Sequence, residues 1–107
     1  MLLAHLRRTR FAPGDRDQAQ ADARAIASYL KREYGARVVG IGSAFVTGRP
    51  FRRTSDIDLV VDGLLAADFF RASARAADMT RFPLDVIPLE CATPLLRERV
   101  EEEGVEL

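Results

Sequence analysis

Residues 37–62 read RVVGIGSAFVTGRPFRRTSDIDLVVD, and this stretch decides the fold. The segments 37–41 and 56–62 are apolar and rich in β-branched residues, as expected of buried strands. Gly42-Ser43 follows the first segment directly and begins a loop that extends to Thr54. The stretch therefore predicts two strands joined by a loop that starts in a glycine-serine turn.

Helical and extended patterns alternate on both sides of this stretch. Apolar residues at helical spacing predict two helices, one with the stripe Ala19, Ala23, Ile26, Leu30 and Tyr34, the other with Leu65, Phe69, Ala72, Ala76 and Met79. Residues 84–87 predict a third strand, at a sheet edge because prolines flank it, and Thr93-Pro94 begins a final helix that stops near Gly104. The order αββαβα indicates an α/β (α+β) domain.

The composition is typical of a globular protein with no global preference for nucleic acid or membranes. The 107 residues suffice for one domain, and 16 basic residues balance 16 acidic ones. Cys91 is the single cysteine, which excludes an internal disulfide and favours a reducing, cytoplasmic location; we expect it to be a small buried residue. No stretch approaches membrane-spanning length. The acidic residues 98–106 are expected to be solvated surface.

Three aspartates are the candidate catalytic residues. Asp56 and Asp58 are two apart on a strand, so they point to one face, about 7 Å apart. Two such carboxylates repel each other, and a divalent cation is the usual remedy. If the third strand lies beside the second, Asp85 joins them, and three carboxylates suit two magnesium ions in phosphoryl or nucleotidyl transfer. Asp85 could also be a general base.

The loop after the first strand is the candidate phosphate-binding segment. Gly42 lets the backbone approach phosphate oxygens, Ser43 adds a hydroxyl donor, and Gly48 supplies a second tight turn. The loop lacks the Lys-Ser/Thr ending of a P-loop, and Gly40-Ile41-Gly42 lacks the third glycine of a dinucleotide fingerprint. The sequence therefore predicts a phosphate cradle of another kind.

Taken together, these residues resemble the signature of the nucleotidyltransferase superfamily that includes DNA polymerase beta. The resemblance is carried by Gly42-Ser43, Gly48, Ser55-Asp56-Ile57-Asp58-Leu59 and Asp85. The small size and the ending Arg97-Glu98-Arg99-Val100, with Gly104 after three more residues, resemble the minimal nucleotidyltransferases (MNT proteins). The resemblance covers the chain from about Val38 to its end.

The resemblance implies a single minimal nucleotidyltransferase domain over residues 1–107, with 1–14 as a basic extension and a mixed-sheet palm flanked by helices. It implies magnesium-dependent transfer of a nucleotidyl group, AMP for preference, from a nucleoside triphosphate to a hydroxyl of a partner macromolecule. Asp56, Asp58 and Asp85 would hold the magnesium ions, and the triphosphate would contact Gly42, Ser43, Gly48 and Ser55. Many MNT proteins are antitoxins of HEPN toxins, which makes a HEPN-like toxin the expected partner; an RNA acceptor is less favoured.

The loop departs from the family pattern. Four residues separate Ser43 from Gly48, where the family usually has three, and the basic residue common there is replaced by Ala44-Phe45-Val46-Thr47. Arg49, Arg52 and Arg53 follow, as phosphate contacts or as solvated loop residues.

Plainer interpretations stay open at this point. Asp56 and Asp58 could cap turns or face solvent, Asp85 could be a solvated edge-strand residue, and Ser55 could bond within the loop. The alternative function is a binding module, an antitoxin that neutralises its partner by direct masking without catalysis.

Overall fold

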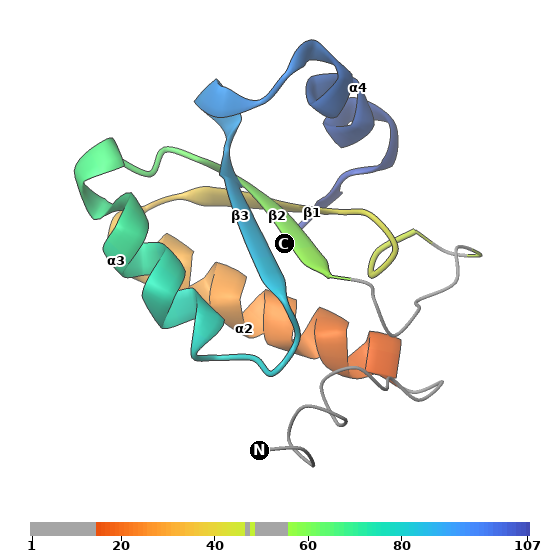
Figure 1. The fold of residues 1–107 in the computed structure, drawn as a ribbon, viewed down its shortest axis with the longest axis horizontal. Helices are drawn as coiled ribbons and strands as arrows, with labels where there is room; N and C mark the ends of the chain where they lie inside the picture. Colours follow the sequence, from red (N-terminus) through yellow and green to blue (C-terminus); the bar gives the residue numbers. More distant parts are fainter. Residues whose placement is uncertain (1–14, 47, 49–55) are drawn as a thin grey trace.

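A four-stranded mixed β-sheet forms the centre of the molecule (Figure 1). The structure is a computed structural model in which residues 15–46, 48 and 56–107 are described. The elements are α2 (Asp15–Tyr34), β1 (Arg37–Ile41), β2 (Ile57–Asp62), α3 (Ala66–Ala77), β3 (Leu84–Pro88), the short 3-10 helix η1 (Leu89–Cys91), α4 (Pro94–Glu103) and β4 (Val105–Glu106). The strand order is β3-β2-β1-β4; β1 is antiparallel to both of its neighbours, and β2 is parallel to β3. The expected fold class is confirmed.

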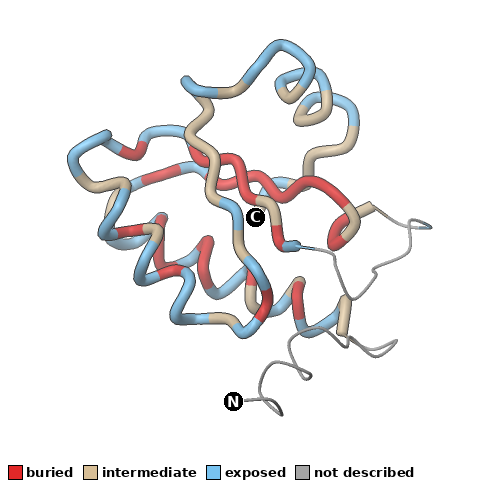
Figure 2. The backbone as a smooth tube through the Cα atoms, viewed as in Figure 1, coloured by how far each residue is buried: buried red, intermediate tan, exposed pale blue. Residues whose placement is uncertain are grey.

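Helices cover both faces of the sheet, but unequally. Helices α2 and α3 lie on one face and α4 on the other (Figure 1). The main core lies under α2 and α3 and includes Ile26, Leu30, Val38, Leu59 and Val61. The buried segments of Figure 2 follow the strands and the inner side of α2. A smaller cluster on the α4 side joins Val39, Ile41 and Val60 of the sheet to the partly buried Ile87, Leu89, Leu96 and Val100.

The two predicted apolar helix stripes differ in how far the structure buries them. Ala19, Ala23, Ile26 and Leu30 of α2 are all buried, and the helix stops before Gly35, whose φ of +65° suits glycine. In α3, Ala72 and Ala76 are buried as expected. The prediction was wrong for Leu65 and Met79, which are 70% and 39% exposed. Both lie outside the helix, which spans 66–77, so helical periodicity does not place them on its buried face.

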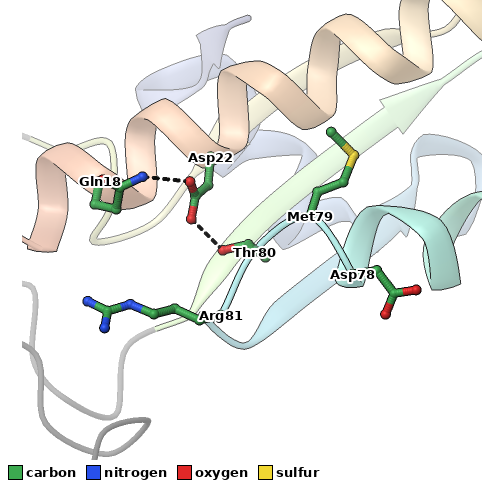
Figure 3. Close-up of a pocket in the computed structure, with 6 residues that line it drawn as sticks. All are labelled: Gln18, Asp22, Asp78, Met79, Thr80 and Arg81. Atoms are coloured by element: carbon green, nitrogen blue, oxygen red, sulfur yellow. Dashed lines mark hydrogen bonds between the residues drawn. The ribbon is translucent and has the colours of Figure 1, made fainter.

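The connection that leads into β3 is tied to α2 by polar contacts (Figure 3). Thr80 Oγ1 donates a hydrogen bond to Asp22 Oδ2 at 2.7 Å, and Gln18 Nε2 donates to Asp22 Oδ1 at 2.8 Å. One residue later, Arg81 forms an ion pair with Asp15 at 3.1 Å. The contacts of Thr80 and Arg81 hold the connection before β3 against α2.

The C-terminal segment closes the opposite edge of the sheet. Thr93 caps α4 by accepting a hydrogen bond from the Leu96 N–H at 3.2 Å, as predicted. The two-residue strand β4, which the sequence did not predict, pairs with β1, and Arg37 forms an ion pair with Glu106 at 3.0 Å. Most of the acidic end is exposed, as expected, but Glu103 is half-buried and paired with Arg99, and Glu106 is paired with Arg37.

Cys91 corrects a further expectation, because it is exposed and not a buried residue. It ends η1, which contributes Leu89 to the smaller cluster but leaves Cys91 outside both clusters. Within the described residues, no helix is both long enough and apolar enough to span a membrane.

Phe45 folds back from the loop onto β1, and its ring occupies the space that a side chain at Gly40 would fill. A Cβ atom on Gly40 would lie 2.5 Å from Cε2 of the Phe45 ring. Phe45 is only 8% exposed and Ala44 is fully buried, and Gln20 of α2 donates a hydrogen bond to the Ala44 carbonyl at 2.7 Å. The first residues of the loop are therefore part of the main core.

We expect Gly40→Ala to destabilise the protein, although alanine in a strand is ordinarily more favourable than glycine by about 0.5–1 kcal/mol. The added methyl group must displace the Phe45 ring, and such overpacking costs about 1–3 kcal/mol. Chemical denaturation would measure the loss, and the same substitution in a Phe45→Ala background should cost less. A Gly40→Ala variant as stable as the wild type would contradict this packing.

Candidate functional site

The three predicted aspartates lie on one face of the sheet, at the start of β2 and β3. The parallel register places Asp58 directly beside Asp85. Asp56 precedes β2 by one residue and is two residues from Asp58, so the two share a face. Val60 and Ile87, two residues further along each strand, belong to the cluster on the α4 side. The acidic group therefore faces away from the main core and toward the side of α4.

The environments of these carboxylates show that their charges act on one another. Burial raises the pKa of the half-buried Asp58, the negative charges of Asp56 and Asp85 raise it further, and Arg99 lowers it. Asp56 has an exposed surface, yet the protein around its carboxyl group displaces enough water to raise its pKa, and the charge of Asp85 adds to this rise. Effects of one charge on the pKa of another carboxyl group need a short separation in a partly desolvated place. The three aspartates therefore lie near enough for the charge of one to raise the pKa of another.

The turn at Gly42 brings the backbone against Asp58. Gly42 has φ +85°, and a Cβ atom there would lie 2.9 Å from Asp58 Oδ2. Its carbonyl accepts hydrogen bonds from the N–H groups of Phe45 at 3.0 Å and Val46 at 3.1 Å, which closes a tight turn over the half-buried Ser43. Only glycine combines this backbone conformation with this approach to a carboxylate.

Of the two remaining residues of the predicted phosphate cradle, Gly48 and Ser55, the structure describes Gly48. Gly48 is exposed and has φ +87°, in agreement with a second turn. Ser55, Thr47 and the loop arginines 49, 52 and 53 lie outside the described residues.

Arg99 is a functional candidate to which the sequence analysis gave no role, although it quoted the residue within the C-terminal motif. Its Nη2 atom lies 3.8 Å from the position of a Cβ on Gly42, close to the Asp58 carboxylate. A signal was present, because Arg99 lies between Leu96 and Val100, the two residues of α4 that pack against the sheet. Helical spacing alone could not show, however, which end of the sheet that side of α4 would reach.

The donor set of this site suits a hard divalent cation. Magnesium prefers carboxylate oxygens, and three aspartates on adjacent strands offer only such donors. Among residues 15–46, 48 and 56–107, no three acidic, histidine or cysteine side chains are already grouped as tightly as a metal requires. Asp56 and Asp85 are exposed, so their carboxylates can rotate toward a shared ion without disturbing the core.

Comparison with solved structures finds this fold in chains from a toxin–antitoxin complex. One match is to the crystal structure of MntA–HpeT with a tyrosine replaced by alanine, with a TM-score of 0.60, 18% identity, and coverage of 78% of this chain and 69% of that chain. Another is to MntA–HpeT with two aspartates, two positions apart, replaced by glutamate, with a TM-score of 0.58, 18% identity, and coverage of 79% and 70%.

At this identity the likeness shows the fold alone, which this chain shares with the matched chains of the MntA–HpeT complex. No protein-family model matches the chain, and the comparison with curated proteins gives no match.

We expect Asp58→Asn to raise the melting temperature at neutral pH in the absence of divalent cations. The pKa of Asp58 is higher in the folded protein than its ordinary value of 3.8, so the folded state binds the proton more tightly than the unfolded chain does. Stability is therefore lost as the pH rises from about that ordinary value through the raised one. The uncharged amide removes this loss, and its advantage should vanish in acid, where the wild-type carboxyl is neutral too.

Asp62→Asn is the matched control, since it removes a charge from the other end of the same strand. Asp62 is the register partner of Arg37, whose pKa is raised first by its hydrogen bond to Glu106 and the charge of that residue and only last by Asp62, so removing the Asp62 charge should not raise stability. Circular-dichroism melts across pH would measure both variants. An Asp58→Asn protein less stable than wild type at neutral pH would show that the carboxylate is a structural group.

Proposed function

We propose that this protein is a magnesium-dependent nucleotidyltransferase. It would transfer a nucleotidyl group, preferably the AMP group of ATP, from a nucleoside triphosphate to a hydroxyl of a partner macromolecule. The observation that carries the proposal is the convergence of Asp56, Asp58 and Asp85 on one face, beside the backbone of Gly42. Adjacent carboxylates with raised pKa values are unfavourable in themselves, and their role with a cation accounts for the arrangement.

Each residue has a definite task in this reaction. Asp56 and Asp58, with Asp85 as the third carboxylate, would hold the magnesium ions, which supply positive charge to the triphosphate and to the transition state. The turn at Gly42 and Ser43 offers the backbone and a hydroxyl to phosphate oxygens. Asp85 takes the proton of the acceptor hydroxyl, whose oxygen forms a bond to the α-phosphorus while pyrophosphate leaves.

The acceptor is proposed to belong to a partner protein, a HEPN-like toxin, with this chain as its antitoxin. Asp56 and Asp85 are exposed, so a large acceptor can reach them. The similar fold of chains from the MntA–HpeT toxin–antitoxin complex supports this assignment. A tyrosine hydroxyl of the partner would fit the chemistry, and the terminal hydroxyl of an RNA is the less favoured acceptor.

We expect Asp56→Ala and Asp58→Asn to reduce nucleotidyl transfer at least about a hundredfold, because the first removes a carboxylate ligand of the cation and the second removes the negative charge of another. Transfer of label from α-labelled ATP to the partner would measure this, and titration calorimetry would measure binding of ATP with magnesium. Asp62→Asn, with its carboxylate at the far end of β2, should keep both properties. Equal metal-dependent binding of ATP by wild type and Asp56→Ala, or none by wild type, would exclude the enzyme.

Neutralisation by direct masking is the second candidate, and exposed apolar side chains favour it. Phe70 on α3 is 83% exposed and Leu65 just before the helix is 70% exposed. Helix α3 lies on the face of the sheet opposite α4, and the aspartates face the α4 side (Figure 1), so a partner could be held at Phe70 without reaching them. A toxin neutralised by Asp58→Asn as well as by wild type, but not by Phe70→Ala, would identify masking as the mechanism; the reverse pattern would identify catalysis.

A further inference from the structure

Arg99 places a positive charge over the acidic end of the sheet from an element that is remote in the sequence. Leu96 and Val100 anchor α4 on the sheet by packing with the cluster of Val39, Ile41 and Val60. Arg99, between these anchors, extends its Nη2 atom to within 3.8 Å of the Cβ position of Gly42. Asp58 Oδ2 lies 2.9 Å from the same point, so a guanidinium, a carboxylate and a glycine backbone share a small volume.

The charge balance of the site calls for such a cation. A nucleoside triphosphate would bring several negative charges to a place that already holds three carboxylates, and magnesium ions offset only part of them. The beginning of the loop cannot supply positive charge, since residues 43–46 are Ser-Ala-Phe-Val. Ala44 and Phe45 are committed to the core. Arg99 therefore brings a positive charge next to the first part of the loop, residues 43–46, which has no basic side chain.

We propose that Arg99 is a phosphate-binding residue that contacts the triphosphate next to the Asp56–Asp58–Asp85 group. This inference rests on the proposed function and adds to it the residue that recognises the phosphates. Guanidinium groups suit this task because their planar N–H donors match pairs of phosphate oxygens. With the metal-holding aspartates on the sheet and Arg99 on α4, the triphosphate is bound between two layers of the fold.

Glu103 is the partner that Arg99 exchanges for phosphate. Arg99 Nε and Nη2 both donate to Glu103 Oε1, at 3.3 and 3.2 Å, one helical turn further along α4. These distances are long for a charged pair, and the Arg99 side chain is 42% exposed. Two of its five N–H donors are used in this pair, in which the Glu103 side chain is 21% exposed, and an i,i+4 pair along one helix adds little stability. A phosphate group can therefore displace the carboxylate at low cost.

The test compares ATP with a bare cation, because Arg99 should affect the two in opposite directions. We expect Arg99→Ala to bind ATP with magnesium about tenfold to a hundredfold more weakly, through the loss of charged hydrogen bonds. The same variant should bind Mn²⁺ alone at least as tightly as wild type, since a positive charge next to the carboxylates has been removed. Titration calorimetry would measure ATP binding, and electron paramagnetic resonance of free Mn²⁺ would measure cation binding.

Two further variants keep the proposal open to refutation if Arg99→Ala proves unstable. Glu103→Gln retains Arg99 but weakens its hold, so it should bind ATP at least as tightly as wild type. Arg97→Ala is the matched control; Arg97 is two residues away on α4 and donates to the Leu89 carbonyl at 2.9 Å, so ATP affinity should change by less than about twofold.

Three results would overturn the proposal. Arg99→Ala could retain wild-type ATP affinity, it could lose ATP and Mn²⁺ affinity in parallel as a merely structural residue would, or Glu103→Gln could bind ATP more weakly. In each of these cases the wild type still binds ATP with magnesium, and the nucleotidyltransferase proposal stands. A wild type that binds neither ATP nor Mn²⁺ would refute both.

Discussion

The parallel pairing of β2 with β3, in the register that sets Asp58 beside Asp85, is the constraint on which the candidate site depends. The register is held by the opposite face of the same strands, where Ile57 and Leu59 are fully buried and Leu84 and Val86 pack against them in the main core. Because side chains alternate along a strand, burying these residues forces the aspartates onto the side of α4. A slip by one residue would exchange the two faces of the strand. The register that buries the main core is therefore the same register that brings the aspartates together.

The candidate site around the three aspartates combines several features that lower the stability of the folded protein. Carboxylates with raised pKa values repel one another, and Gly42 adopts a left-handed conformation against one of them. The rest of the domain compensates through ordinary packing, with Phe45 over Gly40 and the α3–β3 connection fastened to α2 by Asp22 and Thr80. Local conflicts of this kind, in an otherwise consistent fold, are typical of functional sites.

The sequence predicted the three α-helices, three of the strands and, on the condition that the third strand lies beside the second, the grouping of the aspartates, because these follow from periodicity, alternation and strand pairing. It failed where the outcome depends on where a segment ends or on contacts between distant segments. Leu65 and Met79 match the helical stripe but lie beyond the ends of α3. Strand β4 has two residues and no pattern of its own, and it forms because β1 offers a free edge. Arg99 lies near Asp58 because Leu96 and Val100 pack α4 against the sheet, a contact between distant segments that no local pattern encodes.

The central claim is that Asp56, Asp58 and Asp85 act together as a cation-binding group. Anomalous diffraction from crystals grown with Mn²⁺ and a non-hydrolysable nucleoside triphosphate tests it most directly. The account predicts manganese peaks bonded to carboxylate oxygens of these aspartates, with the phosphates lying between the β-sheet and α4. Manganese bound elsewhere, or Asp85 turned away from an ion held by the other two, would contradict it.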